Sequence, residues 1–323
     1  MSELYPLRFT PIFRRYLWGG RRLETSLGKT LGPGHDYAES WEIVDHGEDQ
    51  SIVVAGPLAG TALATLVAEQ GDALFGRHAT PPRFPLLWKF LDAQKDLSVQ
   101  VHPNDEQAAR LDPPDLGKTE AWVIVDVEPG SCLYAGLKSG VDRESLAAHL
   151  AAGTTDACLH RWEPKVGDCI LIEAGTAHAI GAGLLVAEIQ QSSDTTFRLF
   201  DWNRLGTDGK PRQLHLEEGL AVIDFERVDI GPQSPQPTER PHVERLVSCD
   251  KFVLDRWHLS APAAGPGDDR CHILSVVEGA LEVDGDPAGQ PLRRGDTMLL
   301  PACCADAELR PLESTVLLDA YLP

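Results

Sequence analysis

Two segments of the chain repeat one pattern, and this repeat restricts the possible folds more than any other feature. Residues 167–178 read GDCILIEAGTAH, and residues 295–306 read GDTMLLPACCAD. In each copy a polar residue follows the glycine by eleven positions, His178 in the first and Asp306 in the second. Short alternating segments precede each copy, as expected of half-buried β-strands. The repeat therefore predicts a mainly β chain with two similar units.

A proline-rich segment at about 231–241, GPQSPQPTERP, lies between the two copies and is the best candidate for a linker. We therefore divide the chain into residues 1–235 and a smaller unit, 236–323. Helical spacing is limited to short stretches, which begin at about Leu63, cover 142–152 before Gly153, and lie within 213–224. The sequence thus predicts two β units with a few short helices.

The segment LSVQVHP places two polar side chains on one face of a strand. Because side chains alternate along a strand, Gln100 and His102 share a face opposite Val99 and Val101, and Pro103 ends the strand. Glu120 follows at the edge of the apolar run AWVIV. With His178, these residues supply imidazole and oxygen ligands of the kind that zinc accepts. Taken alone, Gln-x-His is more typical of a hydrogen-bonded histidine at a strand end than of a metal ligand.

Composition excludes several classes of function. A formal net charge of −20 over 323 residues argues against nonspecific nucleic-acid binding, which needs many lysines and arginines. It does not exclude an anionic small substrate, because the field inside one pocket is local. Seven cysteines without a C-x-x-C motif, and no secretory leader, predict a cytoplasmic protein. No apolar run reaches the roughly 18 residues that suggest a membrane span.

Residues 167–178 resemble the second motif of the cupin fold, and Gln100-x-His102 with Glu120 resembles the first. Glutamine replaces one histidine of that motif, as in the type I mannose-6-phosphate isomerases. Four segments in order resemble this family, in what looks like its compact bacterial form: TPIFRRYLWGG, PLLWKFLDAQKDLSVQVHPNDEQA, GKTEAWVIV and EIQQSSDTTFRLFDW. The resemblance implies two cupin-type β-barrel (jelly-roll) units.

The resemblance also implies roles for individual residues. Zinc (Zn2+) would be bound by Gln100, His102, Glu120 and His178. The residues expected to act on the substrate are Arg198, Lys118, Asp194 and Lys89. Thr119 stands where the family has proline between the lysine and the glutamate, and Asp306 replaces the histidine in the second copy. The second unit is therefore expected to lack the metal.

The implied reaction interconverts mannose 6-phosphate and fructose 6-phosphate by proton transfer through an enediol. It requires an electrophile for the carbonyl oxygen, an acid and a base near two carbons, and cations for the phosphate. Asp194 is a candidate base, but the sequence does not assign that role. Two alternatives are an iron-dependent cupin oxygenase and a non-catalytic protein that binds a sugar phosphate. The expected partner is a small phosphosugar, and the sequence gives no oligomeric state.

Overall fold

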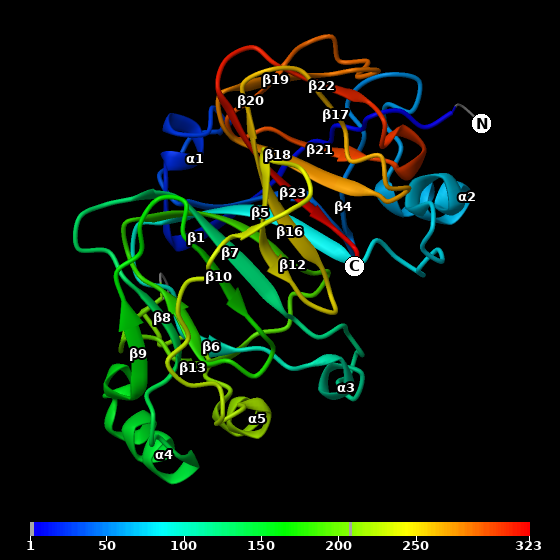
Figure 1. Cartoon of the computed structure of the whole chain (residues 1–323). Helices are drawn as coiled ribbons and strands as arrows, with labels where there is room; N and C mark the ends of the chain where they lie inside the picture. Colours follow the sequence, from blue (N-terminus) through cyan, green and yellow to red (C-terminus); the bar gives the residue numbers. More distant parts are fainter. Residues whose placement is uncertain (1–2, 207–208) are drawn as a thin grey trace.

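The computed structural model describes residues 3–206 and 209–323 and consists mainly of β-strands (Figure 1). The α-helices are short: α1 (Arg22–Thr25), α2 (Leu63–Phe75), α3 (Asp105–Ala108), α4 (Arg143–Ala152) and α5 (Leu216–Val222). Two 3-10 helices cover Thr155–Cys158 and Ala302–Cys304. Among the described residues, no helix has the length and apolar character needed to cross a bilayer.

The first part of the chain forms a six-stranded and a five-stranded sheet. In spatial order, the six-stranded sheet contains β1 (Ile12–Gly20), β2 (Tyr37–Ile43), β5 (Leu86–Ala93), β12 (Leu184–Gln191), β7 (Glu120–Val127) and β10 (Cys169–Ile172). The five-stranded sheet contains β13 (Phe197–Phe200), β6 (Val99–Val101), β11 (His178–Ile180), β8 (Leu133–Leu137) and β9 (Leu159–Trp162). A small hairpin pairs β3 (Asp45–His46) with β4 (Asp49–Gln50).

The second part of the chain also forms two larger sheets. Its six-stranded sheet contains, in spatial order, β14 (Gln236–Pro237), β15 (Val243–Ser248), β16 (Val253–Leu259), β23 (Thr315–Tyr321), β18 (His272–Glu278) and β21 (Thr297–Leu300). Its four-stranded sheet contains β17 (Ala263–Ala264), β22 (Glu308–Pro311), β19 (Ala280–Val283) and β20 (Leu292–Arg293). Within the described ranges no sheet closes on itself, so the expected closed barrels are replaced by paired open sheets.

The sequence repeat corresponds to a repeat of strand pairing. Residues 167–178 contain β10, the last strand of the first six-stranded sheet, and residues 295–306 contain β21, the last strand of the second. Ile172 of β10 lies opposite Glu120 of β7, and Leu300 of β21 lies opposite His272 of β18. Ile172 and Leu300 each lie five residues after the glycine of their copy. The two copies therefore occupy the same place in their sheets.

The two six-stranded sheets share one apolar layer. Along β5, Trp88 and Phe90 face this layer, where Ile273 and Leu318 of the second sheet also lie, and all four are buried. Lys89 alternates with them and faces the other side of the sheet. Burial of each large apolar side chain stabilises the fold by roughly 1.5–3 kcal/mol. The strands are consequently buried on both faces, which explains their nearly continuous apolar sequences.

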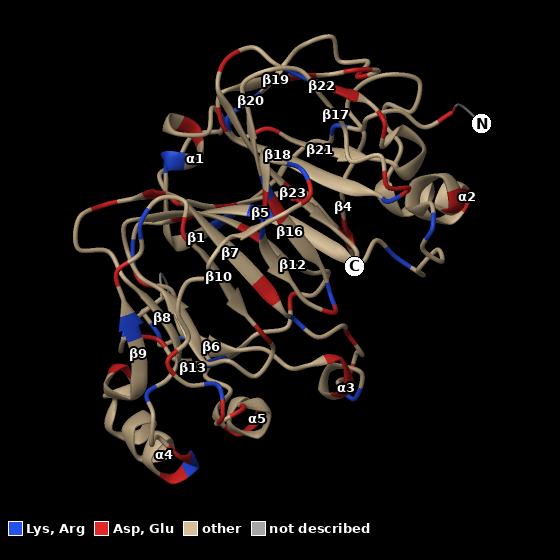
Figure 2. Ribbon diagram, viewed as in Figure 1, with Lys and Arg blue, Asp and Glu red and all other residues tan. Residues whose placement is uncertain are grey.

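Charged residues lie mostly outside these layers. Figure 2 shows the acidic and basic residues mainly in loops and on the short helices, while the central strands are largely free of them. Helix α4 illustrates how sequence sets an element's ends: Asp142 accepts a hydrogen bond from the Ser145 N–H, and Gly153 adopts the left-handed conformation that ends the helix. The predicted helices at Leu63 and 142–152 are confirmed. The predicted linker contains a two-residue strand, β14.

The second part of the chain buries an ionic network around His272. Its Nδ1 lies 2.7 Å from Asp319 Oδ1, and its Nε2 lies 2.9 Å from Asp268 Oδ1. Burial disfavours the imidazolium, but the two carboxylates outweigh burial and raise the pKa of His272 to about 9. His272 is therefore protonated at neutral pH.

This network predicts a pH-dependent contribution to stability. Because the folded pKa of His272 exceeds the unfolded value of 6.5, its contribution is full below about pH 6.5 and is lost as the pH rises through about 9. A shift of this size corresponds to roughly 3 kcal/mol. We expect the free energy of unfolding of His272→Gln to fall furthest below wild type at pH 6.5 and to approach it at pH 9.5. Urea unfolding of both proteins at the two pH values measures this, and a constant difference would contradict it.

Candidate active site

A polar cavity of about 290 Å³ lies in the first part of the chain, against the face of the first six-stranded sheet that is turned away from the shared apolar layer. Its floor carries buried charges that come from four neighbouring strands or their edges. The charged residues that line it are Glu39, Lys89, Lys118, Glu120, Glu188, Asp194, Arg198 and Arg212. Tyr16 and Trp18, whose rings stack 5.6 Å apart, form part of the wall. All four residues that the sequence predicted to act on the substrate therefore line one cavity.

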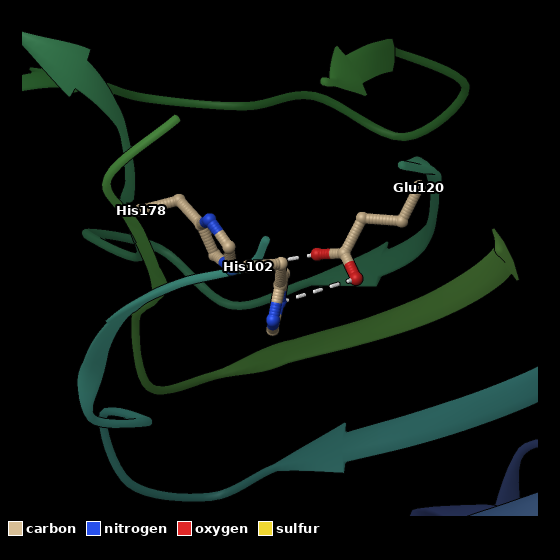
Figure 3. A group of neighbouring side chains, drawn as sticks. All are labelled: His102, Glu120 and His178. Atoms are coloured by element: carbon tan, nitrogen blue, oxygen red, sulfur yellow. Dashed lines mark ion pairs between the residues drawn. The ribbon is translucent and has the colours of Figure 1, made fainter. Parts of the chain in front are cut away.

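Three of the predicted metal ligands converge beside this cavity (Figure 3). His102 Nε2 lies 3.6 Å from Glu120 Oε2, and His178 Nε2 lies 3.4 Å from Glu120 Oε1. One ligand atom from each residue falls within 4.8 Å of the others, and each residue is 1% exposed. The fourth, Gln100, lies opposite His178 across the β6–β11 pair, with its Nε2 3.3 Å from His178 Nε2.

Main-chain carbonyls orient both imidazoles. His102 Nδ1 lies 2.9 Å from the Thr195 carbonyl oxygen, and His178 Nδ1 lies 2.9 Å from the Thr176 carbonyl oxygen. Because a carbonyl oxygen only accepts, each Nδ1 carries a proton and each Nε2 directs a lone pair toward the centre. Burial lowers the pKa of both histidines. Two neutral imidazoles thus present the atoms that a divalent ion binds.

The turn before His178 explains how distant segments meet. Gly175 has φ +88°, a conformation that glycine tolerates, and its N–H donates to the His102 carbonyl oxygen at 2.9 Å. A Cβ at this position would lie 3.2 Å from the Val222 carbonyl oxygen. The glycine of the motif therefore ties the turn that presents His178 to the end of the strand that presents His102.

Glu120 is held as a carboxylate inside the protein. Burial favours its neutral form, but the Lys118 ammonium outweighs burial and keeps the pKa of Glu120 well below its ordinary value. Lys118 Nζ lies 2.8 Å from Glu120 Oε2 and 3.1 Å from His102 Nε2. Lys118 therefore lies against two of the candidate ligands.

Lys89 occupies the opposite part of the floor and is surrounded by carboxylates. Its Nζ lies 3.1 Å from Glu188 Oε1 and 3.5 Å from Glu39 Oε2. Burial disfavours the ammonium, but Glu188 and Glu39 outweigh it and raise the pKa of Lys89. Burial, together with the charge of Glu120, raises the pKa of Glu188 to about 7. Lys89 thus remains protonated, while Glu188 can take up a proton near neutral pH.

Arg198 and Asp194 lie toward the mouth of the cavity. Arg198 on β13 lies opposite Gln100 on β6, and its guanidinium donates to Ser98 Oγ at 3.3 Å and to the Gln213 carbonyl oxygen at 3.0 Å. Asp194 is exposed. Arg212 adds a second guanidinium to the lining.

Sequence reasoning missed several polar residues of the lining, among them Glu39, Glu188, Ser98 and Arg212. Glu188 left a detectable signal, because it is the only acid in the apolar strand LLVAEIQ. Glu39 lies in YAESWEI, a strand with two glutamates, and the sequence does not indicate which of them faces the cavity. Arg212 follows a loop and is held by Asp201, with its Nε 2.7 Å from Asp201 Oδ2, a contact that no local pattern indicates.

Comparison with known proteins agrees with this arrangement. Residues 7–118 match the catalytic domain of phosphomannose isomerase type I. The mannose-6-phosphate isomerase ManA of Bacillus subtilis (strain 168) is 37% identical over 303 residues, which cover 92% of this chain and 93% of the relative. The mannose-6-phosphate isomerase of Streptococcus mutans serotype c is 33% identical over 296 residues, which cover 92% of each chain.

Solved structures give the same result for the fold. The mannose 6-phosphate isomerase from Bacillus subtilis superposes with a TM-score of 0.89 at 31% identity and covers 99% of this chain and 100% of its own. A putative mannosephosphate isomerase from Archaeoglobus fulgidus shares the fold, with a TM-score of 0.81 at 22% identity and coverage of 100% and 99%. The chain therefore belongs to the type I phosphomannose isomerase family and is an isomerase.

Proposed function

We propose that this isomerase interconverts mannose 6-phosphate and fructose 6-phosphate at the described cavity, with zinc bound by Gln100, His102, Glu120 and His178. The observation that carries the proposal is the convergence of three buried ligand atoms within 4.8 Å beside a cavity that also holds lysines and arginines. The relatives that match over nine tenths of the chain are mannose-6-phosphate isomerases by name, which supports the same substrate.

The donor set fits a zinc ion. Two Nε2 lone pairs and one carboxylate are ligands that zinc prefers. The hydrogen bonds at Nδ1 already orient both imidazoles. The Gln100 amide directs its nitrogen toward His178, and a half-turn of the amide presents its oxygen instead. When bound, zinc would act as a Lewis acid toward an oxygen of the substrate.

The chain's own residues supply the remaining requirements of the reaction. Removal of a proton from the carbon beside a carbonyl leaves negative charge on oxygen, as in an enediolate. Lys118 and Lys89 place buried ammonium groups on the cavity floor, where low dielectric strengthens their effect on such charge. Arg198 and Arg212 offer planar forks that suit a phosphate or an enediolate at the mouth.

Two carboxylates of the lining are candidates for the base, Asp194 and Glu188. A base works best when its pKa lies near the working pH. Glu188 meets this condition, since its pKa is raised to about 7, and its Oε1 lies 3.1 Å from the Lys89 ammonium, which can orient its carboxylate. We therefore add Glu188 to the proposed catalytic residues and retain Asp194, Lys89, Lys118 and Arg198 in that set.

The architecture supports a finer division of the chain. We infer that the two pairs of sheets are cupin-type units, residues 1–235 and 236–323, and that the second unit does not bind the metal. The matching strand order of the two six-stranded sheets supports the first inference. The exposed Asp306 in place of His178 supports the second. A cytoplasmic location remains a prediction, and the free cysteines support it.

The metal site can be tested by removing one ligand. His102→Ala should lose both zinc and isomerase activity, because only two residues of the types that zinc favours, Glu120 and His178, then remain, fewer than the usual three. Metal analysis of the purified variant and a coupled assay with mannose 6-phosphate measure the two effects. Full metal content with full turnover in the variant would place the site elsewhere.

Arg198 can be tested for a role in the chemical step. If it stabilises charge that exists only in the transition state, Arg198→Ala should lower kcat and kcat/KM together, by about 10²-fold or more. Arg198→Lys should restore little, because an ammonium lacks the planar fork. Steady-state kinetics of both variants decide the matter: a raised KM with wild-type kcat would leave Arg198 as a binding residue.

Removing the carboxylate of each candidate base in turn distinguishes the two candidates. Glu188→Gln keeps the shape of the side chain but cannot accept the proton, so we expect kcat to fall by about 10²-fold or more. Asp194→Asn serves as the matched variant and should lower kcat less. Measurement of kcat for both variants at pH 7 distinguishes the bases, and the reverse order would assign the role to Asp194.

A further inference from the structure

The second unit contains a cavity of about 1150 Å³ that is larger than the active-site cavity. It lies between the segment 233–240 and the strands β15, β16, β18 and β23. Its aromatic and charged lining residues are Glu239, Arg240, Arg245, Asp255, Trp257, Asp268, His272, Asp319 and Tyr321. None of these residues takes part in the site described above.

The polar floor of this cavity repeats the position of the active site. In the first six-stranded sheet, Glu188 of β12 lies opposite Lys89 of β5. In the second, Asp319 of β23 lies opposite Asp255 of β16, in the corresponding pair of strands. The pairing of Glu120 with Ile172 and of His272 with Leu300 completes the match. The second cavity therefore has its charged floor at the place where the first holds its catalytic charges.

Burying the charged residues of this floor costs free energy. Asp255, His272, Asp319 and Tyr321 are each 6% exposed or less. Two carboxylates, Asp255 and Asp319, lie directly opposite one another on adjacent strands, an arrangement that destabilises a sheet. Apolar side chains of similar size are often as stable as buried ion pairs, or more stable. Packing alone therefore does not explain why charged residues occupy these buried positions, whereas binding of a ligand would.

Hydrogen bonds connect the residues of the floor and leave acceptor positions on Asp319. Asp319 accepts from His272 through one oxygen and from Trp257 Nε1, at 3.2 Å, through the other. Tyr321 donates to Asp255 at 2.8 Å, and Arg245 contacts both. A carboxylate offers about four lone-pair positions, so Asp319 can accept further hydrogen bonds.

The charge of the lining argues against an anion. Arg245 is paired with Asp255, and His272 is held by two carboxylates. Arg240 donates to the carbonyl oxygens of residues 264–266 and lies over the Trp257 ring. Each cation that lines the cavity is thus already engaged, and the acids outnumber the cations. Carboxylate acceptors beside aromatic rings instead suit hydroxyl groups, which donate hydrogen bonds and carry no charge.

We propose that the second cavity binds an uncharged polyhydroxylated molecule, a sugar or a sugar alcohol, independently of the active site. Its hydroxyl groups would donate to Asp319 and to Asp255, the carboxylate to which Tyr321 donates a hydrogen bond. The proposal does not depend on the substrate of the isomerase.

Calorimetric titration of the whole enzyme with D-mannitol and with D-mannose tests the proposal. We expect one saturable site per chain for at least one of the two probes. Asp319→Asn and the conservative Tyr321→Phe should each weaken it by about tenfold, as expected for the loss or disturbance of a hydrogen bond to a charged group. Thermal unfolding of each variant verifies that the fold is intact, and Tyr321→Phe should leave isomerase turnover unchanged.

Glu188→Gln is the matched control, because it changes the corresponding position of the first unit. It should leave the binding of both probes unchanged. Three results would overturn the proposal: no saturable binding of either probe to the wild-type enzyme, weaker binding in Glu188→Gln with wild-type binding in Asp319→Asn and Tyr321→Phe, or displacement of the probe by inorganic phosphate, which would show an anion site.

Discussion

The apolar layer shared by the two six-stranded sheets decides where polar groups can lie. Because one face of β5, β7 and β12 is committed to this layer, the charged side chains of these strands must face the interior of the first unit. Three adjacent strands each carry one such side chain: Lys89 on β5, Glu188 on β12 and Glu120 on β7. The same layer that stabilises the fold therefore gathers these charged groups into one cavity.

Electrostatics inside that cavity separates the carboxylates into different roles. Glu120 lies between an ammonium and two imidazoles and stays ionised, whereas Glu188 shares Lys89 with Glu39 and titrates near neutrality. Burial opposes charge at both positions, so the difference comes from the number and sign of the neighbours. Two glutamates of similar burial thus differ in protonation near neutral pH: Glu120 is ionised, and Glu188 is partly protonated.

Much of this arrangement could be predicted from the sequence, and the exceptions have physical reasons. Alternation along LSVQVHP and the glycine turn before His178 are local patterns, so the ligand candidates and the repeat could be identified from the chain alone. The closed barrels were not found within the described residues, because local alternation specifies which face of a strand is buried but not whether the edges of a sheet meet. Glu39 and Arg212 escaped prediction because their positions depend on the packing of distant segments.

The carbonyl oxygens of Thr195 and Thr176 that receive the two Nδ1 protons belong to the main chain. Every residue type carries such an oxygen, so the orientation of His102 and His178 does not depend on which side chains occupy positions 195 and 176. Substitution of the side chains at these positions therefore leaves the imidazoles in place as long as the backbone conformation is unchanged. The course of the chain, rather than the side chains at positions 195 and 176, thus sets the orientation of the two imidazoles.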